Sequence, residues 1–305
     1  MASLFKLTFL GTGGSWPTPG RSMPALVLQV DGTVNLIDCG EGTQKQLMKS
    51  RISFMDVDNV FISHFHGDHF IGLIGLVQSM SFNGRTKPLN IYCPEFGTRI
   101  LSNALSVGYY TLNFDINVME VDPGQIYDLG EFTVSAMKTD HPVPALAYRF
   151  SEKDLIRIDR SKVDSLGIPN RLIERIRQKG SVEHDGVTYT INQISGGVRK
   201  GRSLVYSGDT RPMPEEMPKF AENASVLIHE TTTDSSLEPK VNEFGHTSSR
   251  QAAEIAAKSG AKRFFLFHYS PRVSDLQSLE KEARSIFHES YLSREMLEFS
   301  IPSEG

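Results

Sequence analysis

The sequence contains few cysteines and few tryptophans. It has two cysteines and one tryptophan in 305 residues. Cys39 and Cys93 match neither a disulfide framework nor a cysteine-rich zinc module, and free thiols are typical of a reducing compartment. We therefore expect a cytoplasmic protein.

Long hydrophobic runs are also missing. The first residues, MASLFKLTFLGTGG, contain one lysine and a short alternating apolar pattern, whereas a signal peptide needs an apolar core of roughly 7 to 15 residues. No other run approaches the roughly 20 apolar residues of a membrane span. The sequence predicts a soluble chain with no membrane partner.

A global excess of positive charge is absent, because the formal net charge is -4 and the pI is near 6.2. Charge is nevertheless uneven. From Arg149 to Arg202 there are twelve Lys or Arg and seven Asp or Glu, a net of +5, so the remainder carries -4 - 5 = -9. This segment includes IPNRLIERIRQKG, whose spacing clusters basic side chains on one flank of a short helix: Arg171, Arg175, Arg177 and Lys179. A solvated helix face and a phosphate-binding arm both explain this pattern.

Apolar periodicity predicts a mixture of strands and helices. Strands are expected over 5–10, 25–30, 33–38, 59–63, 89–92, 132–137, 203–207, 225–228 and 263–267, and helices over 41–51, 70–80 and 248–259. Asp31-Gly32 is the kind of pair that closes a two-residue hairpin. Two mixed sheets packed face to face, with helices outside, satisfy this order. The predicted fold class is α/β, of the α+β kind.

The stretch SHFHGDHF, residues 63–70, carries the strongest chemical signal. It directly follows an apolar run and supplies four nitrogen and oxygen ligands, His64, His66, Asp68 and His69. A divalent ion needs several ligands that converge on one point, and a turn after a strand can supply them. A lone histidine is more often a satisfied polar residue, but four such side chains in one turn indicate metal binding.

Three further candidates follow apolar stretches in the same way. They are His141 in TDHPV, Asp209 in YSGDTR and His268 in FLFHYS. Each alone could be a core or capping residue, but their repeated placement at strand ends favours ligation. So many ligands indicate two metal ions.

These segments resemble the metallo-β-lactamase superfamily and, within it, the ribonuclease Z family of tRNA 3′-processing endonucleases. The resemblance spans nearly the whole chain and includes FLGTGGSWPTPGR, LIDCGEGTQKQL, SHFHGDHFIGLIGL, DHPVPALAYRF, YSGDTRP, LIHETT, GHTSSRQAAEIA and FFLFHYSPR. It implies a single αββα sandwich domain over residues 1–305, with a protruding basic arm that binds tRNA inserted at about residues 150–200.

The resemblance also implies a site with two Zn²⁺ per subunit. One ion would be bound by His64, His66 and His141, the other by Asp68, His69 and His268, with Asp209 as the bridge and Asp38 as support for a ligand. The same ligand types accept Mn²⁺ or Fe²⁺. Two ions a few ångströms apart suit phosphodiester hydrolysis, because they lower the pKa of a water and neutralise charge on the phosphate.

Metal ions supply no proton for the leaving 3′ oxygen. The resemblance assigns that role to His246 in GHTSS, supported by Glu230 in HETT, while Asp68 could accept the proton of the water. From the residues alone, His246 could equally be a helix-entry residue before Ser248.

The expected function is a zinc-dependent endoribonuclease that removes the 3′ trailer of precursor tRNA, leaving a 3′-hydroxyl on the tRNA and a 5′-phosphate on the trailer. The resemblance implies a homodimer. The alternative is a phosphodiesterase or metallohydrolase of the same superfamily that acts on small molecules, which the metal site alone would support. A binding protein with a degenerate site is a third hypothesis, which the full set of candidate ligands disfavours.

Overall fold

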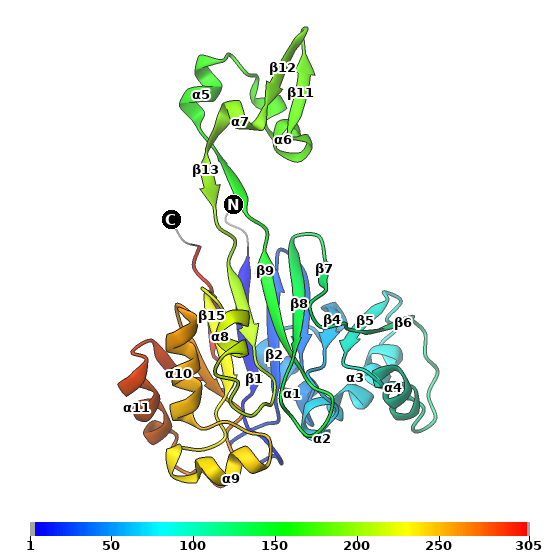
Figure 1. Cartoon of the computed structure of the whole chain (residues 1–305). Coiled ribbons are helices and arrows are strands. Elements are labelled where there is room, and N and C mark those ends of the chain that lie inside the picture. The colour runs from blue at the N-terminus through cyan, green and yellow to red at the C-terminus, as the bar shows by residue number, and fades with distance from the viewer. Residues whose placement is uncertain (1–3, 304–305) are drawn as a thin grey trace. The chain divides into compact units, whose positions relative to one another are not determined.

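The computed structural model describes residues 4–303. Its contacts divide the chain into two compact units. The larger unit contains the described residues up to Ser151 together with Ser203–Pro302, and the smaller unit contains Glu152–Arg202. Figure 1 labels the elements of both units.

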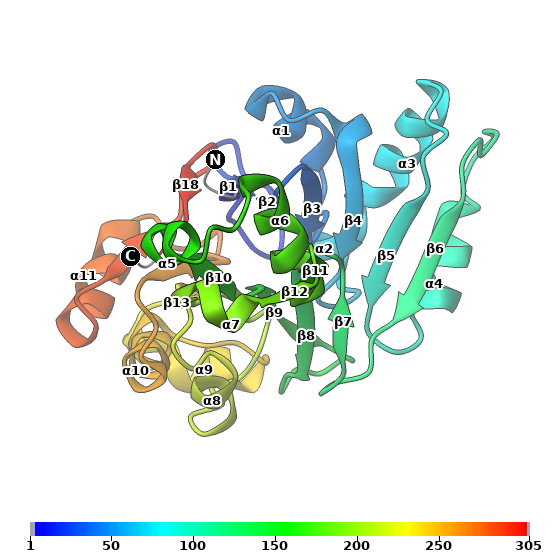
Figure 2. The same cartoon turned by 90° about the horizontal axis from the view of Figure 1, so that it is seen from above.

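Two mixed sheets form the frame of the larger unit, as predicted, and each has seven strands. The first sheet, seen from above in Figure 2, has the order β18-β1-β2-β3-β4-β5-β6, and the second has the order β17-β16-β15-β14-β9-β8-β7. The strands of the first sheet are β1 (Phe5–Gly11), β2 (Ala25–Val30), β3 (Thr33–Ile37), β4 (Val57–Phe61), β5 (Leu89–Cys93), β6 (Ile116–Glu120) and β18 (Glu298–Ser300). Those of the second are β7 (Ile126–Asp128), β8 (Phe132–Lys138), β9 (Leu146–Glu152), β14 (Ser203–Tyr206), β15 (Val226–Glu230), β16 (Phe264–Phe267) and β17 (Ser290–Leu292).

Helices cover the outer face of each sheet, which gives the αββα layering. An aromatic-rich core lies between the sheets, a second core lies under the helices of the first sheet, and a third lies under those of the second. The helices on the first sheet are α1 (Thr43–Ser50), α3 (Gly72–Phe82) and α4 (Gly97–Leu105), and the short η1 (Phe54–Asp56) and α2 (Gly67–Phe70) lie between α1 and α3 in sequence. Those on the second are α8 (Glu216–Phe220), α10 (Ser249–Ser259) and α11 (Leu276–Ile286), and η2 (Ser235–Leu237) and α9 (Glu238–Glu243) lie between β15 and α10 in sequence.

The hairpin predicted at Asp31-Gly32 is confirmed. Val30 pairs with Thr33, and the two turn residues have φ of 40° and 89°, as a tight hairpin turn requires. The apolar helix expected over 70–80 begins later, at Gly72, because Gly67–Phe70 form a separate turn of helix.

Parallel strands place the candidate site residues at one edge of each sheet. Strands β3 to β6 are parallel, and so are β14 to β17. Asp38 follows β3, His64 follows β4, Asp209 follows β14, Glu230 ends β15 and His268 follows β16. The carboxyl ends of parallel strands meet at the same edge of a sheet, and open α/β sheets bind ligands there.

Four asparagines form a ladder across the parallel strands of the first sheet. Each donates a side-chain N–H to the side-chain oxygen of the next: Asn117 to Asn90 at 3.0 Å, Asn90 to Asn59 at 3.0 Å, and Asn59 to Asn35 at 2.8 Å. Asn35 ends the ladder by donating to the Leu28 carbonyl at 3.0 Å. The amides thereby satisfy one another, which offsets the cost of burying Asn35 and Asn59.

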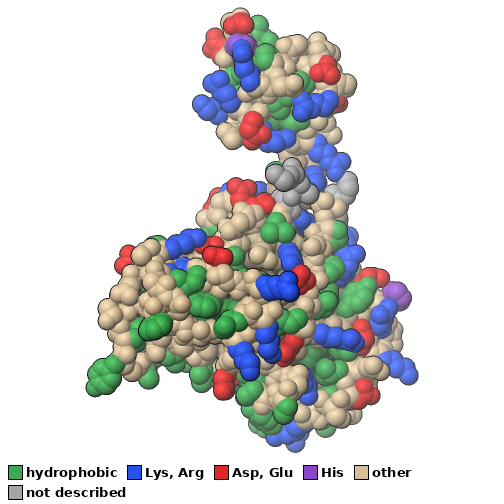
Figure 3. Space-filling model, turned by 180° about the vertical axis from the view of Figure 1, so that it is seen from behind, with side chains coloured by type: hydrophobic (Ala, Val, Ile, Leu, Met, Phe, Trp, Pro, Cys, Tyr) green, Lys and Arg blue, Asp and Glu red, His purple; other side chains and the backbone are tan. Residues whose placement is uncertain are grey.

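The smaller unit has its own core, built from residues such as Leu172, Ile173 and Ile176. These three lie on α6, whose other side carries exposed basic side chains. Figure 3 shows Lys and Arg side chains on the surface of the smaller unit. The helix predicted within 168–180 is therefore present, over Asn170–Lys179. The remaining elements are β10 (Leu155–Ile158), α5 (Arg160–Ser165), β11 (Ser181–His184), β12 (Val187–Thr190), α7 (Ile191–Ile194) and β13 (Ser195–Arg199).

Cys39 and Cys93 are buried free thiols. Burial raises the pKa of both thiols to about 12, so each is protonated and unreactive at neutral pH. Among residues 4–303, no helix is both long enough and apolar enough to cross a bilayer.

Candidate metal centre

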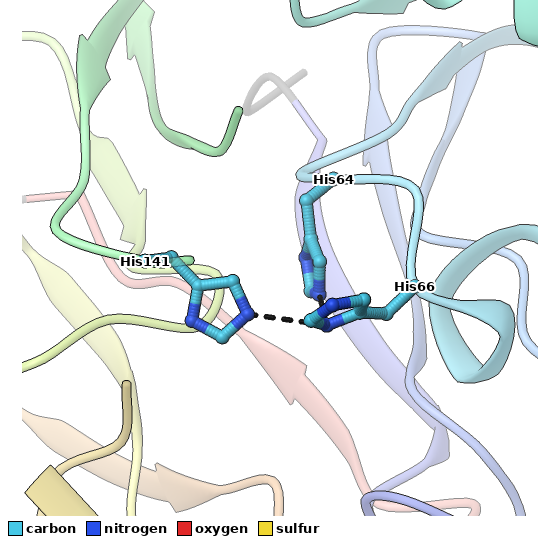
Figure 4. A group of neighbouring side chains, drawn as sticks. All are labelled: His64, His66 and His141. Atoms are coloured by element: carbon cyan, nitrogen blue, oxygen red, sulfur yellow. Dashed lines mark hydrogen bonds between the residues drawn. The ribbon is translucent and has the colours of Figure 1, made fainter. Parts of the chain in front are cut away.

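Three histidines converge from two segments. His64 and His66 follow β4, and His141 lies in the loop between β8 and β9. His66 Nδ1 lies 3.1 Å from His64 Nε2 and 3.1 Å from His141 Nε2 (Figure 4). Burial lowers the pKa of all three imidazoles, so they are neutral and have a lone pair to offer a cation.

A second group contains Asp68, His69 and His268. Their ligand atoms lie within 4.8 Å of one another, and the Nε2 atoms of His69 and His268 are 3.2 Å apart. Asp68 and His69 are supplied by α2, directly after the segment that carries His64 and His66. The short segment from His64 to His69 therefore contributes to both groups. His64 and His66, which lie before α2, belong to the first group, and Asp68 and His69, which lie in α2, belong to the second.

Asp209 lies between the two groups. Its Oδ2 is 3.8 Å from His64 Nε2, 3.5 Å from His69 Nε2 and 3.4 Å from His268 Nε2. Burial raises the pKa of Asp209, but the charges of His268 and His69 outweigh burial and hold that pKa well below its usual range. The carboxylate is therefore an anion that faces ligand atoms of both groups.

This donor set fits metal ions. The Oδ1 atom of Asp209 is buried without a hydrogen-bond partner among the residues that the structure describes, and such an atom is costly unless a cation or proton satisfies it. Imidazole nitrogens and carboxylate oxygens that lie this close together are the ligands of zinc and similar divalent ions.

Asp38 fixes the orientation of His69. Its Oδ2 accepts from His69 Nδ1 at 2.7 Å, from the Tyr206 hydroxyl at 2.6 Å and from the Ser63 hydroxyl at 2.8 Å. Its Oδ1 accepts from the Ser63 backbone N–H at 2.7 Å. Held in this way, His69 keeps its Nε2 directed toward Asp209 and His268, as the residues that orient a metal-binding histidine do.

Several residues of this network were not predicted from the sequence. Tyr206 and Ser63 sit inside apolar strand patterns, where a hydroxyl signals nothing in particular. The Gly245 carbonyl accepts from His141 Nδ1 at 2.9 Å, and the Ser15 N–H donates to Asp68 Oδ2 at 2.6 Å. Backbone groups leave no trace in the choice of side chain, so no sequence pattern could have identified them.

Three residues at or next to the metal centre have strained backbone conformations. Ser15, Asp38 and His268 have φ of 69°, 54° and 59°. Non-glycine residues rarely adopt this left-handed conformation, and they keep it where surrounding contacts hold them, often at functional sites.

His246 and Glu230 form a pair at the border of the cluster. His246 Nδ1 lies 3.1 Å from Glu230 Oε1, and Glu230 also accepts from the Thr210 N–H at 2.9 Å and the Thr232 hydroxyl at 2.7 Å. Burial lowers the pKa of His246, but the Glu230 carboxylate outweighs burial and raises it to about 9. The Nε2 of His246 makes no hydrogen bond to any described residue, so this nitrogen can donate to a substrate.

The four predicted basic residues belong to the smaller unit and not to this cluster. Arg171, Arg175, Arg177 and Lys179 are all exposed on α6. Arg177 pairs with Glu174 at 3.1 Å, and Arg171 contacts His184 at 3.3 Å.

Comparison with known proteins gives the family. Residues 5–159 match the family described as Anti-Pycsar protein Apyc1, and residues 174–269 match the Beta-lactamase superfamily domain. The chain is 58% identical to the ribonuclease Z of Thermoplasma volcanium over 301 residues, 99% of each chain. It is 53% identical to that of Picrophilus torridus, over 99% of this chain and 97% of the relative.

A solved structure agrees with these relatives. The short form of human tRNase Z is 28% identical, with a TM-score of 0.72, over 97% of this chain and 99% of the human chain. High identity over the full length and a matching fold lead to one conclusion: this chain belongs to the ribonuclease Z family of the metallo-β-lactamase superfamily.

Proposed function

We propose that this chain is the endoribonuclease that removes the 3′ trailer from precursor tRNA, leaving a 3′-hydroxyl on the tRNA and a 5′-phosphate on the trailer. The observation that carries the proposal is the arrangement of two ligand groups around Asp209, with the His246–Glu230 pair beside them. This arrangement provides for a metal-assisted attack on phosphorus and, separately, for a proton donor to the leaving oxygen.

The proposed cofactor is two Zn²⁺ per subunit, although Mn²⁺ or Fe²⁺ suits the same ligands. His64, His66 and His141 would hold one ion, Asp68, His69 and His268 the other, and Asp209 would contact both. When bound, the ions supply Lewis-acid neutralisation of the phosphate charge and make a water more acidic.

The chain's own residues would move the protons. Burial raises the pKa of Asp68, but His69 and His268 outweigh burial, so this carboxylate is ionised and can accept the proton of the attacking water. His246 would donate its Nε2 proton to the leaving 3′ oxygen while Glu230 holds the proton at Nδ1. Glu230 thereby stabilises the protonated imidazole before transfer and fixes its tautomer afterwards.

The smaller unit is the proposed tRNA-binding arm, inserted into one sandwich domain. Its support is local charge: the segment from Arg149 to Arg202 carries +5, and the four basic residues of α6 are exposed. Phosphate contacts by such residues supply much of the affinity for nucleic acids.

The alternative function, a phosphodiesterase for small molecules, is supported by the metal centre alone. The two functions separate on a 3′-extended tRNA precursor incubated with the purified protein. We expect one cut at the start of the trailer, with a 3′-hydroxyl on the tRNA fragment. An intact precursor, together with rapid hydrolysis of a nitrophenyl phosphodiester, would favour the alternative.

We also propose a homodimer. No charged residue occurs from Phe70 to Gly84, and the outward side of α3 exposes apolar groups: Ile71 is 48% exposed and Phe82 is 93% exposed. Met48 of α1 is 67% exposed as well, and α1 is in contact with α3. Exposed apolar side chains that gather on one side of a molecule are normally covered by a partner, and a second copy can cover this side symmetrically.

Sedimentation tests the dimer. Ile71→Lys and Phe82→Lys should each yield monomers, while Leu166→Lys, a change at an exposed leucine of the smaller unit, should leave the dimer intact. A wild-type monomer would refute the proposal.

We also propose a cytoplasmic location, because both cysteine thiols are free and free thiols are typical of a reducing compartment.

A further inference from the structure

The single tryptophan of the chain lies beside the metal centre and not in a core. Trp16 is 46% exposed. A tryptophan side chain offers a large apolar surface, so exposing about half of it forgoes much of the stabilisation that packing would give. Neither the proposed metal chemistry nor the proposed proton transfers use this residue.

The two residues before Trp16 pack directly on proposed metal ligands. The Ser15 N–H donates to Asp68 Oδ2 at 2.6 Å, and the Gly14 N–H donates to the Tyr269 carbonyl at 3.0 Å. A methyl group at Gly14 would lie 2.4 Å from the ring of His268. The backbone that presents Trp16 is therefore pressed against Asp68 and His268, which places the indole at the rim of the centre.

A second loop brings a positive charge to the same ring. The guanidinium of Arg272 lies over Trp16, 5.2 Å from the ring centroid. Arg272 comes four residues after His268, is exposed, and forms no ion pair with any residue in the described part of the chain. A cation over an aromatic face is attracted by the ring electrons, so Arg272 orients the indole and keeps its own charge available.

Arg21 ties the two loops together. Its Nη1 donates to the Ser270 carbonyl at 3.1 Å, and its Nη2 donates to the Val273 carbonyl at 2.8 Å. The turn that directly follows this segment is closed by the Thr18 N–H, which donates to the Arg21 carbonyl at 3.0 Å. Trp16 and Arg272 are thus held side by side before any ligand arrives.

We propose that Trp16, backed by Arg272, is a stacking platform for an unpaired nucleobase of the RNA next to the scissile phosphate. Every base has an apolar π-face, and stacking on an exposed aromatic ring binds it without regard to sequence. Arg272 adds a positive charge that suits the phosphate of the same nucleotide. This inference rests on the proposed function: Trp16 binds the substrate of that centre and takes no part in proton transfer.

A double-mutant cycle, in which a substitution in the protein is combined with a change in the RNA, tests the platform. Precursor tRNAs are made with an abasic ribose at the nucleotide before the cut or at the nucleotide after it, and kcat/KM is measured for wild type and Trp16→Leu. On normal RNA we expect Trp16→Leu to lose roughly 5- to 100-fold, the range for loss of one stacked base. The abasic change at the stacked position should cost wild type a similar factor and cost Trp16→Leu little more.

Two variants calibrate the cycle. Trp16→Phe keeps a smaller ring and should recover part of the loss. Tyr109→Leu removes another exposed aromatic ring, which lies in the loop between α4 and β6, and should behave as wild type. All variants should contain as much metal as wild type, because the Trp16 side chain makes no hydrogen bond to a proposed metal ligand among the described residues.

Fluorescence provides a readout that needs no cleavage. Trp16 is the only tryptophan, so a short single-stranded oligoribonucleotide should quench the emission of the wild-type protein, and an abasic oligomer of the same length should not. Equal responses to the two oligomers, or additive losses at both positions in the cycle, would overturn the platform. Failure of wild type to cut any precursor tRNA would instead refute the proposed function, and the fluorescence titration would still decide the platform.

Discussion

The metal centre and helix α6 use charged residues in opposite ways. In the centre, the carboxylates and imidazoles are mostly buried, and several are held by identified hydrogen bonds, such as the four that Asp38 accepts. On α6, Arg175 and its basic neighbours are exposed to solvent. Buried polar groups are costly unless paired, so their geometry is tightly fixed. Exposed charges keep their hydration and act over longer distances through their field.

This difference predicts two kinds of mutant. Changes in the centre should affect every substrate, because all substrates need the same fixed chemistry. Changes on α6 should affect tRNA alone, because small phosphodiesters have no extended backbone to bind.

The largest effect is expected for Asp209→Ala. Because Asp209 faces both ligand groups, its loss leaves both metal positions one ligand short. Metal content should fall, and activity on tRNA and on a nitrophenyl phosphodiester should drop to background. Asp275→Ala, at the exposed N-cap of α11, is the matched control and should retain its metal. Full metal occupancy in Asp209→Ala would contradict the bridging role.

His246→Ala should keep its metal and lose roughly 10²- to 10⁴-fold in kcat on tRNA, the usual contribution of general acid–base catalysis. A nitrophenyl phosphodiester has a good leaving group that needs little protonation, so its hydrolysis should suffer less. Metal analysis and steady-state kinetics on both substrates check this. Equal losses on the two substrates would remove His246 from the acid role.

Removing the smaller unit should separate the contribution of that unit to tRNA binding from the contribution of the metal centre to hydrolysis. Leu155 pairs with Arg199, so residues 155–199 can be replaced by a short Gly/Ser linker. Affinity for tRNA should fall by on the order of 10²-fold at low salt, and its log–log salt dependence should flatten by about 0.9 for each duplex phosphate that the protein no longer neutralises. Phosphodiester hydrolysis should persist.

A milder variant of this experiment changes Arg171, Arg175 and Arg177 to alanine. It should weaken tRNA binding less than the replacement and leave the cleavage position unchanged, because phosphate contacts orient a substrate without selecting the bond. If affinity and salt dependence stay at wild-type values after the full replacement, the RNA-binding surface lies elsewhere.

The smallest effect is expected for Asp38→Asn. The amide is the same size as the carboxylate but loses the charge that His69 contacts at 2.7 Å. Metal affinity should fall roughly 10- to 100-fold, as for other residues that orient a ligand. Competition with a chelator measures this change. Tyr206→Phe removes one of the hydrogen bonds to Asp38 and should lie between this variant and wild type.

The sequence predicted the sandwich and the candidate ligands because both leave local signals. Strand ends were visible as apolar runs that stop at polar residues, and His64 to His69 are concentrated in one turn. The strands β6, β7, β9, β17 and β18 of the two sheets were not predicted. The residues of β6, β7 and β18 are half-buried or exposed, so the hydrophobic alternation that identifies a strand is weak there. Strands β9 and β17 are mostly buried, and this reason does not apply to them.

Contacts between distant segments were harder to predict. Tyr206 meets Asp38 across a separation of 168 residues, and the Gly245 carbonyl meets His141 across 104. Such pairs arise from how the two sheets stack, and no local spacing encodes them. Trp16 illustrates the same limit, because its position at the rim follows from contacts with residues more than fifty positions away.

The asparagine ladder affects how the first sheet assembles. Parallel strands pair only after long connections have closed, which makes their assembly slow and open to error. Hydrophobic contact alone tolerates a strand that has slipped by two residues, since the same side chains still face inward. In a sheet that has slipped at β4, Asn59 would no longer meet Asn35 and Asn90, and buried amides would be left without partners. The ladder therefore penalises incorrect strand pairings during folding. As a result, the alignment of Asp38 with His64 at the far ends of β3 and β4 depends on asparagine side chains that never touch the metal centre.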